Sequence, residues 1–529
     1  MKKSFKNKKG ITLIALVVTI IVLIILAGIS ISLVLGNNGI ITKAKEGKED
    51  AIVGQEKEQV ELAYVSAAVK KLGDNVTEQD LQDELDASVG TNKTKVTEKD
   101  NNLLNVWFYD TAHNYNIDNG KVSKVEPLEL HISNYAELLD FANRVNNGEL
   151  FEDYIVYLDK DIEMETDEWI MIGTSGDRDN LPNSFKGIFE GNNHIIKEFN
   201  DNTNRFDIGL FYINDGIIKN FNIEGKIECE RADKVYMGMI ASSNNGTIQN
   251  CKVNITVDNT NLSNNNNTSN IGGITGTNYG TIIDCSVNGD LSVSGDFVNV
   301  GGIVGENDGF IKNCTYNGSI SYDSSMYYGR RNDQRYIGGI AGITREEISG
   351  CINLGTITLN ACNGGGIVGE CKGTISGCIN KGNLAVSLNS DSSYAIVGGI
   401  CARGSGAILL NCYNIGNITW NGKGYIVEGG GILADYGGED IKRIENCYSI
   451  GNIDECYNSC KAVFGKINTT EVIKNCYYNN EICSLTEEIA TGLTTQEMKR
   501  SEFVEMLGDE FVADTNNINN GYPILKWQK

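Results

Sequence analysis

The chain has 529 residues, with 45 lysines and arginines against 69 aspartates and glutamates, for a formal net charge of −24 at pH 7. Because such an acidic surface repels phosphate, nucleic-acid binding is excluded as the main activity. The chain has only three histidines and no HExxH motif, which excludes most zinc hydrolases. Sixty glycines against three prolines indicate many tight turns or close backbone approaches.

The N-terminus joins a basic leader, residues 1–10, to a long apolar segment. Five of the first nine residues are lysines, and residues 11–35 carry no charge. As a helix, that segment spans roughly 37 Å at about 1.5 Å per residue, enough to cross a hydrocarbon core of about 30 Å. The sequence therefore predicts a single pass through the lipid bilayer of the cell membrane. Because lysines stay on the cytoplasmic side, the N-terminal end would be cytoplasmic. The bulk of the chain would then be extracellular, at the cell surface.

The junction Lys8-Lys9-Gly10-Ile11, followed at once by the apolar segment, resembles the cleavage and methylation signal of type IV pilins and pseudopilins. The resemblance implies that a prepilin peptidase cuts after Gly10, that Ile11 becomes the methylated N-terminal residue, and that other pilins are partners. The family's usual glutamate, five residues after the cut, is Ala15 here. That glutamate is thought to pair with a neighbour's terminal amine during assembly. Ala15 therefore favours a minor or tip-located pilin-like protein, or a plain membrane anchor, over a major subunit.

The transmembrane, pilin-like helix is predicted to extend over residues 11–72. Its second half is rich in lysine, glutamate and alanine, with apolar residues at helical spacing. Residues 73–127 contain alternating segments at 105–109 and 114–117, and Asp118-Asn119-Gly120 is a turn sequence. They predict a small antiparallel sheet, which would be a reduced pilin-like head or a spacer.

A repeat governs residues 206–483. In the clearest copy, Gly302 precedes Cys314 by twelve residues and Gly318 follows it by four. Eight copies have a cysteine, at positions 251, 285, 314, 351, 378, 412, 447 and 476, and an earlier copy has Phe221 in its place. A period near 30 residues with short strands and no helical periodicity predicts a mainly β fold, a parallel β-solenoid. We expect a right-handed parallel β-helix with one coil for each of these nine copies.

The repeats resemble the GLUG motif, which occurs in bacterial surface proteins that include adhesins and some surface-anchored proteases. This resemblance implies a surface setting and names no activity. The flanking segments resemble the ends of such solenoids: residues 128–205 would form an N-terminal cap and the first coils, and residues 484–529, helical over 484–510, a C-terminal cap. Caps are expected because open coils expose unpaired strand edges.

The eight repeat cysteines are predicted to form a ladder of buried free thiols. Equivalent residues on adjacent coils lie about 4.8 Å apart, which is too far for the Cβ atoms of a disulfide. Phe221 in the same position also indicates an apolar environment. Cys456 and Cys460 lie four residues apart and could pair or bind a metal, although no second cluster or histidine supports a metal.

Carboxylates are scattered through the repeats, whereas solenoid enzymes that act on polysaccharides need them clustered. Glu306 and Glu370 are equivalent, Asp308 stands beside Gly309, and other copies lack these acids. We therefore expect no catalytic residues, no metal site, no cofactor and no enzyme activity. The best candidate for ligand contact is an insertion whose aromatic and arginine side chains suit sugars or proteins. Its residues are Tyr322, Tyr327, Tyr328, Arg330, Arg331, Arg335 and Tyr336.

Together these features predict a membrane-anchored, surface-displayed β-solenoid protein that acts in binding or adhesion and is exported as a pilin-like protein. Its ligand would be a surface glycan or a protein, which the sequence does not specify. Two alternatives stay open. The chain could be a minor pilin or pseudopilin component of a type IV pilus or type II secretion-like system. It could also be an extracellular polysaccharide-active enzyme.

Overall fold

The chain forms two compact units in the computed structural model, Met1–Pro127 and Leu128–Lys529. The structure describes residues 40–71, 75–90, 93–99, 103–108, 111, 113–166, 168–176, 182–231, 234–262, 268–295, 297–323, 335–360, 362–388, 394–422, 426–456, 459–468 and 470–529.

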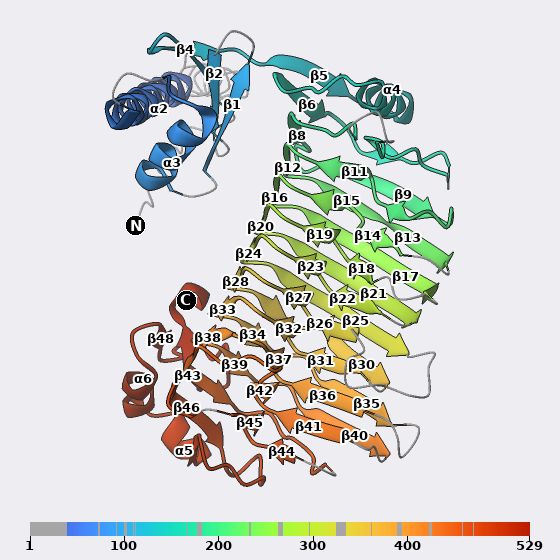
Figure 1. Ribbon diagram of the computed structural model, residues 1–529, viewed down its shortest axis with the longest axis vertical. Helices are drawn as coiled ribbons and strands as arrows, with labels where there is room; N and C mark the ends of the chain where they lie inside the picture. Colours follow the sequence, from blue (N-terminus) through green and yellow to red (C-terminus); the bar gives the residue numbers. More distant parts are fainter. Residues whose placement is uncertain are drawn as a thin grey trace, which may run out of the picture. The chain divides into compact units, whose positions relative to one another are not determined.

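The first unit is a pair of helices packed on a four-stranded antiparallel sheet (Figure 1). Its elements are α2 (Ile40–Lys71), α3 (Glu78–Ser88), β1 (Thr94–Lys99), β2 (Leu103–Phe108), β3 (Asn114–Asp118) and β4 (Lys121–Val125). Asn119 and Gly120 join β3 to β4 with positive φ angles of 49° and 80°, as the turn sequence requires. The predicted small antiparallel sheet is confirmed, and so is the second half of the helix predicted over residues 11–72, as α2.

Among the described residues, no helix is both long enough and apolar enough to cross a membrane. The predicted membrane segment, residues 11–35, lies outside the described part of the chain, as do the predicted processing residues Gly10 and Ile11.

The second unit is a parallel β-solenoid, as predicted (Figure 1). In a representative coil the chain passes through β22 (Val298–Gly301), β23 (Val304–Asn307), β24 (Phe310–Lys312) and β25 (Thr315–Asp323). Each strand pairs in parallel with its equivalents on the coils before and after. Over the described residues, the first and second strands of the coils build two nine-stranded sheets, here called sheet 1 and sheet 2. The third and fourth strands share one larger sheet, sheet 3.

Sheets 1 and 2 run the length of the coil stack. Sheet 1 consists of β10 (Asp207–Ile208), β14 (Tyr236–Met237), β18 (Ser269–Gly272), β22, β26 (Arg335–Gly338), β31 (Asn363–Gly365), β36 (Tyr394–Gly398), β41 (Ile426–Gly430) and β44 (Ser459–Lys461). Sheet 2 consists of β11 (Phe211–Asn214), β15 (Ala241–Asn244), β19 (Thr275–Asn278), β23, β27 (Ala341–Thr344), β32 (Val368–Cys371), β37 (Cys401–Gly404), β42 (Leu433–Asp435) and β45 (Phe464–Lys466).

Sheet 3 contains two rows of strands and the strands at either end of the solenoid. Its third-strand row is β8 (Ile188–Glu190), β12 (Ile217–Lys219), β16 (Thr247–Gln249), β20 (Thr281–Ile283), β24, β28 (Glu347–Ser349), β33 (Thr374–Ser376), β38 (Ile408–Leu410), β43 (Arg443–Ser449) and β46 (Ile473–Asn479). Its fourth-strand row is β9 (Ile195–Asp201), β13 (Asn222–Arg231), β17 (Lys252–Leu262), β21 (Ser286–Gly295), β25, β29 (Ile352–Asn353), β30 (Thr356–Asn360), β34 (Ile379–Asn380), β35 (Leu384–Leu388), β39 (Tyr413–Asn414) and β40 (Ile418–Gly422). The end strands are β5 (Leu128–Ile132), β6 (Tyr154–Leu158), β7 (Ile162–Glu163) and β47 (Thr491–Leu493).

A pair of glycines forms the sharp corner between sheets 1 and 2 in most repeats. A Cβ on Gly301 would lie 1.9 Å from the carbonyl oxygen of Val304. A Cβ on Gly302 would lie 2.3 Å from the ring of Tyr316, which fills the interior at that level. Any side chain at either position would therefore collide with backbone or core.

The repeat cysteines follow the corner between the third and fourth strands. The residue before each of the eight is Asn, Asp or Gly with φ between 49° and 62°, a left-handed conformation. In six of the eight copies it separates the third strand from the fourth, whereas β43 and β46 continue through it. Each thiol donates to the carbonyl oxygen two residues earlier, at 3.2 to 3.4 Å. All eight cysteines are buried and free, so the predicted thiol ladder is confirmed.

The two ends of the solenoid are covered in different ways. At the N-terminal end, α4 (Tyr135–Asn146) packs Phe141 into the aromatic start of the core. At the C-terminal end, one carboxylate oxygen of Glu487 accepts hydrogen bonds from the backbone N–H groups of Val463 and Phe464, at 3.2 and 3.0 Å. Those N–H groups would otherwise be left unpaired on the last coil.

The rest of the C-terminal segment lies along the side of sheet 3 (Figure 1). Helix was predicted throughout residues 484–510, but only α5 (Thr495–Met498) and α6 (Ser501–Leu507) form, followed by β48 (Phe511–Val512), β49 (Ile524–Leu525) and a 3₁₀ turn (Lys526–Gln528). These elements pack on the outward-facing rings of Tyr413, Tyr448 and Tyr477. The segment is therefore mostly a side cover, and only its beginning covers the end of the core.

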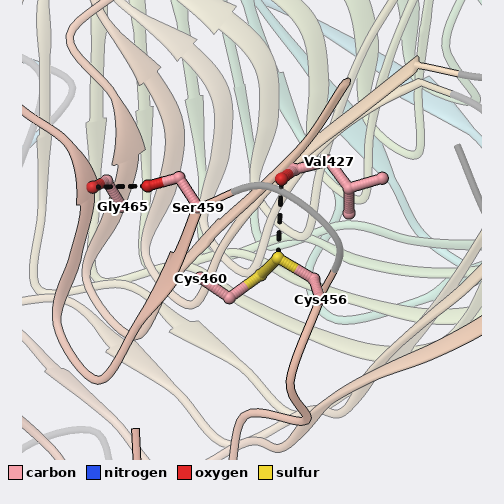
Figure 2. The surroundings of a disulfide bond; sticks show 5 residues. All are labelled: Val427, Cys456, Ser459, Cys460 and Gly465. Atoms are coloured by element: carbon pink, nitrogen blue, oxygen red, sulfur yellow. Dashed lines mark hydrogen bonds between the residues drawn. A yellow bond between two sulfur atoms is a disulfide. The ribbon is translucent and has the colours of Figure 1, made fainter. Parts of the chain in front are cut away.

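Cys456 and Cys460 form a disulfide beside the last strand of sheet 1 (Figure 2). One sulfur lies 3.4 Å from the carbonyl oxygen of Val427, on the preceding coil. A Cβ on Gly429 would lie 2.7 Å from the sulfur of Cys460, so the disulfide packs directly on that glycine. The sequence left open whether these two cysteines form a disulfide or bind a metal, and the structure shows the disulfide. No group of histidine, cysteine, aspartate and glutamate side chains in the described residues could hold a metal ion.

Candidate binding site

Four side chains from three consecutive coils meet on the outer surface of sheet 2. Tyr279, Asp308 and Arg345 are equivalent residues, each directly after its sheet 2 strand, and Glu306 lies within β23. Backbone hydrogen bonds stack these turns: Asp308 N–H donates to the carbonyl oxygen of Asn278 at 2.7 Å, and Arg345 N–H donates to that of Asn307, on the preceding coil, at 2.9 Å. Figure 1 shows β19, β23 and β27 side by side. We call these four residues the sheet 2 cluster.

A single nitrogen of Arg345 holds both carboxylates of the sheet 2 cluster. Its Nη1 donates to Oε1 of Glu306 at 2.5 Å and to Oδ1 of Asp308 at 2.7 Å. Burial opposes protonation of Arg345, but the hydrogen bonds to Asp308 and Glu306 outweigh burial and raise its pKa. The guanidinium is a fixed positive charge whose side chain is still 41% exposed.

Buried amides fix the position of Glu306 from behind. Asn270, on β18 of sheet 1, donates from Nδ2 to the second oxygen of Glu306 at 2.5 Å and to the Thr277 hydroxyl at 3.2 Å. Asn299, one coil further on, donates to Oδ1 of Asn270 at 2.9 Å. Because these amides are almost fully buried, they hold the carboxylate in one orientation.

Tyr279 is the exposed aromatic member of the sheet 2 cluster. Its ring is 57% exposed. Partial burial, followed by the charges of Glu306 and Asp308, raises the pKa of its hydroxyl, which therefore keeps its proton at neutral pH. Beside it, a Cβ on Gly309 would lie 2.2 Å from the carbonyl oxygen of Gly280, so only glycine fits there and the adjoining surface carries no side chain.

Further along sheet 2, the outward row that contains Glu306 is charged and mostly buried. Glu370, Arg403, Asp435 and Lys466 are register partners on successive strands. Arg403 donates to the Tyr336 hydroxyl, on sheet 1, at 3.2 Å. Asp435 is only 2% exposed. This row connects coils and sheets to one another, and most of it is out of reach of a ligand.

The residues predicted as a ligand loop divide into two groups. Tyr322, Arg335 and Tyr336 are buried strand residues, so their assignment to an exposed loop is wrong. Strand β25 continues through Tyr322, whose hydroxyl donates to the carbonyl oxygen of Gly295 at 2.5 Å, and β26 already begins at Arg335. The other four, Tyr327, Tyr328, Arg330 and Arg331, lie outside the described residues.

The sequence singled out Glu306 and Asp308 but missed Arg345 and Tyr279. The signal was available, because aligning the repeats on their glycine pairs places Tyr279, Asp308 and Arg345 in one column. Residues in one column of a solenoid are neighbours on its surface. Because the three side chains in this column differ in chemistry, the column does not stand out as a recurring carboxylate.

No protein-family model matches the chain, and no curated protein matches it. Among solved structures, it is similar to a Bacteroides ovatus protein provisionally described as an immunoglobulin A1 protease. That match has 18% identity and a TM-score of 0.38, and covers 75% of this chain and 92% of the other. It is also similar to a structure described as IgA1 protease, with 13% identity and a TM-score of 0.33, covering 76% of this chain and 25% of the other. At these values the likeness carries no argument about function.

Proposed function

We propose that the chain is a membrane-anchored, surface-displayed protein that binds an extracellular ligand through its solenoid and performs no chemistry on it. The observation that supports this proposal is the position of the insertions. Every connection from a fourth strand to the next sheet 1 strand leaves at the same corner of the coil, and these connections differ in length. Strand β25 ends at Asp323 and β26 begins at Arg335, whereas β21 ends at Gly295 and β22 begins at Val298.

Unequal insertions gathered on one side of a repeat scaffold are typical of a binding surface. The longest of them, residues 324–334, includes Tyr327, Tyr328, Arg330 and Arg331. Tyrosine and arginine supply large contact areas and directed hydrogen bonds. We therefore keep these four residues in the proposal as ligand contacts.

Export as a pilin-like protein, cut after Gly10 and anchored by the apolar segment, is the second part of the proposal. The disulfide between Cys456 and Cys460 supports it, because disulfides persist mainly in oxidising compartments outside the cytoplasm. The thirteen free cysteines are all buried, which would protect them from oxidation there.

A minor pilin or pseudopilin is a second candidate. Helix α2 leads on from the apolar segment and packs on a four-stranded antiparallel sheet, the plan expected of a reduced pilin head. A polysaccharide-active enzyme is a weaker candidate. The two carboxylates that the sequence offered for catalysis, Glu306 and Asp308, bind the same nitrogen of Arg345, whereas an acid and a base need different environments.

Attachment of cells that display the full chain tests the binding proposal. Removing residues 324–334 should abolish most attachment to surfaces coated with glycans or host extracellular proteins. Removing residues 389–393, a shorter insertion at the same corner without arginine or aromatic residues, is the matched control and should have little effect. Equal attachment of both deletion variants and the wild type would contradict the assignment of the longest insertion.

N-terminal sequencing and the intact mass of protein taken from its native membrane test the export proposal. We expect a mature chain that begins at methylated Ile11. A chain that begins at Met1 would contradict pilin-type processing, and would leave the binding proposal untouched.

A further inference from the structure

We propose that the sheet 2 cluster (Tyr279, Glu306, Asp308 and Arg345) is a binding site for an uncharged sugar residue of a surface glycan. The inference rests on the proposed binding function. It adds a contact site away from the insertions and names the chemistry of the ligand.

The donors of this site come from Arg345. Its Nη1 serves both carboxylates, while Nε and Nη2 have no hydrogen-bond partner among the described residues. The guanidinium therefore presents a planar edge to solvent, along which the N–H groups of Nε and Nη2 are free to donate hydrogen bonds. Such an edge matches two neighbouring oxygen atoms, as in a pair of adjacent sugar hydroxyls.

The acceptor comes from Asp308. Its Oδ1 is bound to Arg345, and its Oδ2 has no partner in the part of the chain that the structure describes. The matching oxygen of Glu306 is already taken by Asn270. One free carboxylate oxygen beside free N–H groups gives a ligand both an acceptor and donors, which hydroxyl groups can use together because each donates and accepts.

The aromatic surface comes from Tyr279, with Phe310 nearby. Phe310 is 39% exposed and follows Gly309, whose backbone lies against the peptide between Tyr279 and Gly280. An aromatic ring beside backbone that carries no side chain offers a flat apolar surface to the C–H face of a sugar ring.

Charge favours an uncharged ligand. The sheet 2 cluster has one guanidinium against two carboxylates, and the whole chain carries −24. Sugars with carboxylate or phosphate groups would be repelled by that field. A cationic peptide would meet the guanidinium of Arg345 at the centre of the site, so a neutral polyhydroxylated ligand fits best.

A purely structural role for Arg345, as a link between coils, makes a different prediction. A lysine at this position keeps the positive charge that links β27 to β23 but loses the planar edge. If the arginine only links coils, Arg345→Lys should leave ligand binding intact. If it contacts a sugar, binding should weaken while the unfolding temperature stays the same.

The experiment measures binding of the full-length chain, purified in detergent, to immobilised glycans with neutral or acidic terminal sugars. We expect binding to neutral glycans, weakened about tenfold or more by Tyr279→Ala, by Arg345→Lys and by Asp308→Asn. Two control variants should bind like the wild type. Lys372→Gln changes the equivalent of Arg345 on the next coil, and Trp527→Ala removes another exposed aromatic ring, which is 45% exposed.

The outcomes separate this inference from the proposed function. Binding that prefers acidic glycans, or that survives all three variants, overturns the sugar site and leaves a binding protein. If attachment needs residues 324–334 and a protein ligand, and no glycan is bound at all, the sugar site is also overturned and the chain is still a binding protein. Absence of attachment to every glycan, protein and cell surface overturns both.

Discussion

The early and late coils of the solenoid build the same corner from different residues. Two positions after the repeat cysteine, the early coils have Val253, Val287 and Tyr316, and their fourth strands continue unbroken as β17, β21 and β25. The next coils have asparagine at this position, and the strand divides into the pairs β29/β30, β34/β35 and β39/β40. Asn353 Oδ1 accepts from Gly355 N–H at 3.0 Å, and its Nδ2 donates to Asn380 at 2.8 Å.

The outer face of the same coils changes as well. One position after the cysteine, Lys252, Ser286 and Thr315 are polar and partly or fully exposed, whereas Tyr413 and Tyr448 are buried under the C-terminal segment. The glycines and cysteines therefore determine where the backbone turns. The residue types at the other positions depend on whether another segment covers the coil. They also depend on whether an asparagine side chain hydrogen-bonds to the backbone two residues on and so divides the strand.

Removing the covered ring should have the largest effect on stability. Tyr448→Ala deletes a fully buried side chain that stacks on Tyr413 at 4.9 Å and accepts from Asn519 Nδ2 at 2.8 Å. We expect a loss of about 4 kcal/mol in the free energy of unfolding, measured by chemical denaturation. The equivalent change in an early coil, Ser286→Ala, should stay within about 0.5 kcal/mol. Equal effects would show that the C-terminal segment contributes no packing.

Breaking the asparagine ladder, the row of buried and hydrogen-bonded Asn353, Asn380 and Asn414, should have the next largest effect. Asn380→Val removes the donor to Oδ1 of Asn414 and one of the two acceptors of Nδ2 of Asn353, which keeps the carbonyl oxygen of Gly355, all in buried positions. The expected cost is about 3 kcal/mol, because buried polar groups lose their hydrogen bonds. Asn421→Ala, on the exposed side of β40, is the matched control and should be nearly neutral. A stable Asn380→Val variant would contradict the role assigned to the ladder.

Opening the disulfide should have a smaller, local effect. The loop between Cys456 and Cys460 is short, so its loss should cost only about 2 kcal/mol. In the Cys456→Ser/Cys460→Ser double variant, amide hydrogen exchange should quicken at Ser459–Lys461, while the early coils exchange as before. Uniformly faster exchange along the whole solenoid would show that the last coil is not an independent unit.

The thiols should show no difference between early and late coils. Burial raises the pKa of Cys371 to about 12 and also raises the pKa of Cys351. Because alkylation requires a thiolate that the reagent can reach, and all thirteen free cysteines are buried, the folded chain at pH 8 should not be labelled at them. Mass spectrometry after denaturation should find all thirteen modified. Labelling of one half of the ladder in the folded chain would mark that half as open.

The repeat spacing predicted what depends on short-range geometry. The offset from Gly302 to Cys314 gave the coil, its corners and the buried thiol, because each follows from backbone conformation within one repeat. Tyr322 was misplaced because an aromatic residue near arginines suggests a surface, whereas its strand alternation continues inward from Ile320. Arg345 lies in one column with Asp308 once the repeats are aligned on their glycine pairs, but the alignment does not show which side chains of adjacent coils bind each other.

The side cover could not be predicted from its own sequence. Tyr413 and Tyr448 did carry a signal, since polar residues occupy their position in early copies. That signal reports that something covers them and does not identify the covering segment. The contact of Tyr448 with Pro523 and Asn519 spans more than seventy residues and becomes visible only in the folded chain.

The most direct test of the central claim is equilibrium binding of the full-length chain to surface glycans, with the bound ligand recovered and weighed by mass spectrometry. We expect saturable binding and an unchanged ligand mass. Saturable binding with a cleaved or otherwise altered ligand would show an enzyme and contradict the claim that this solenoid binds without chemistry.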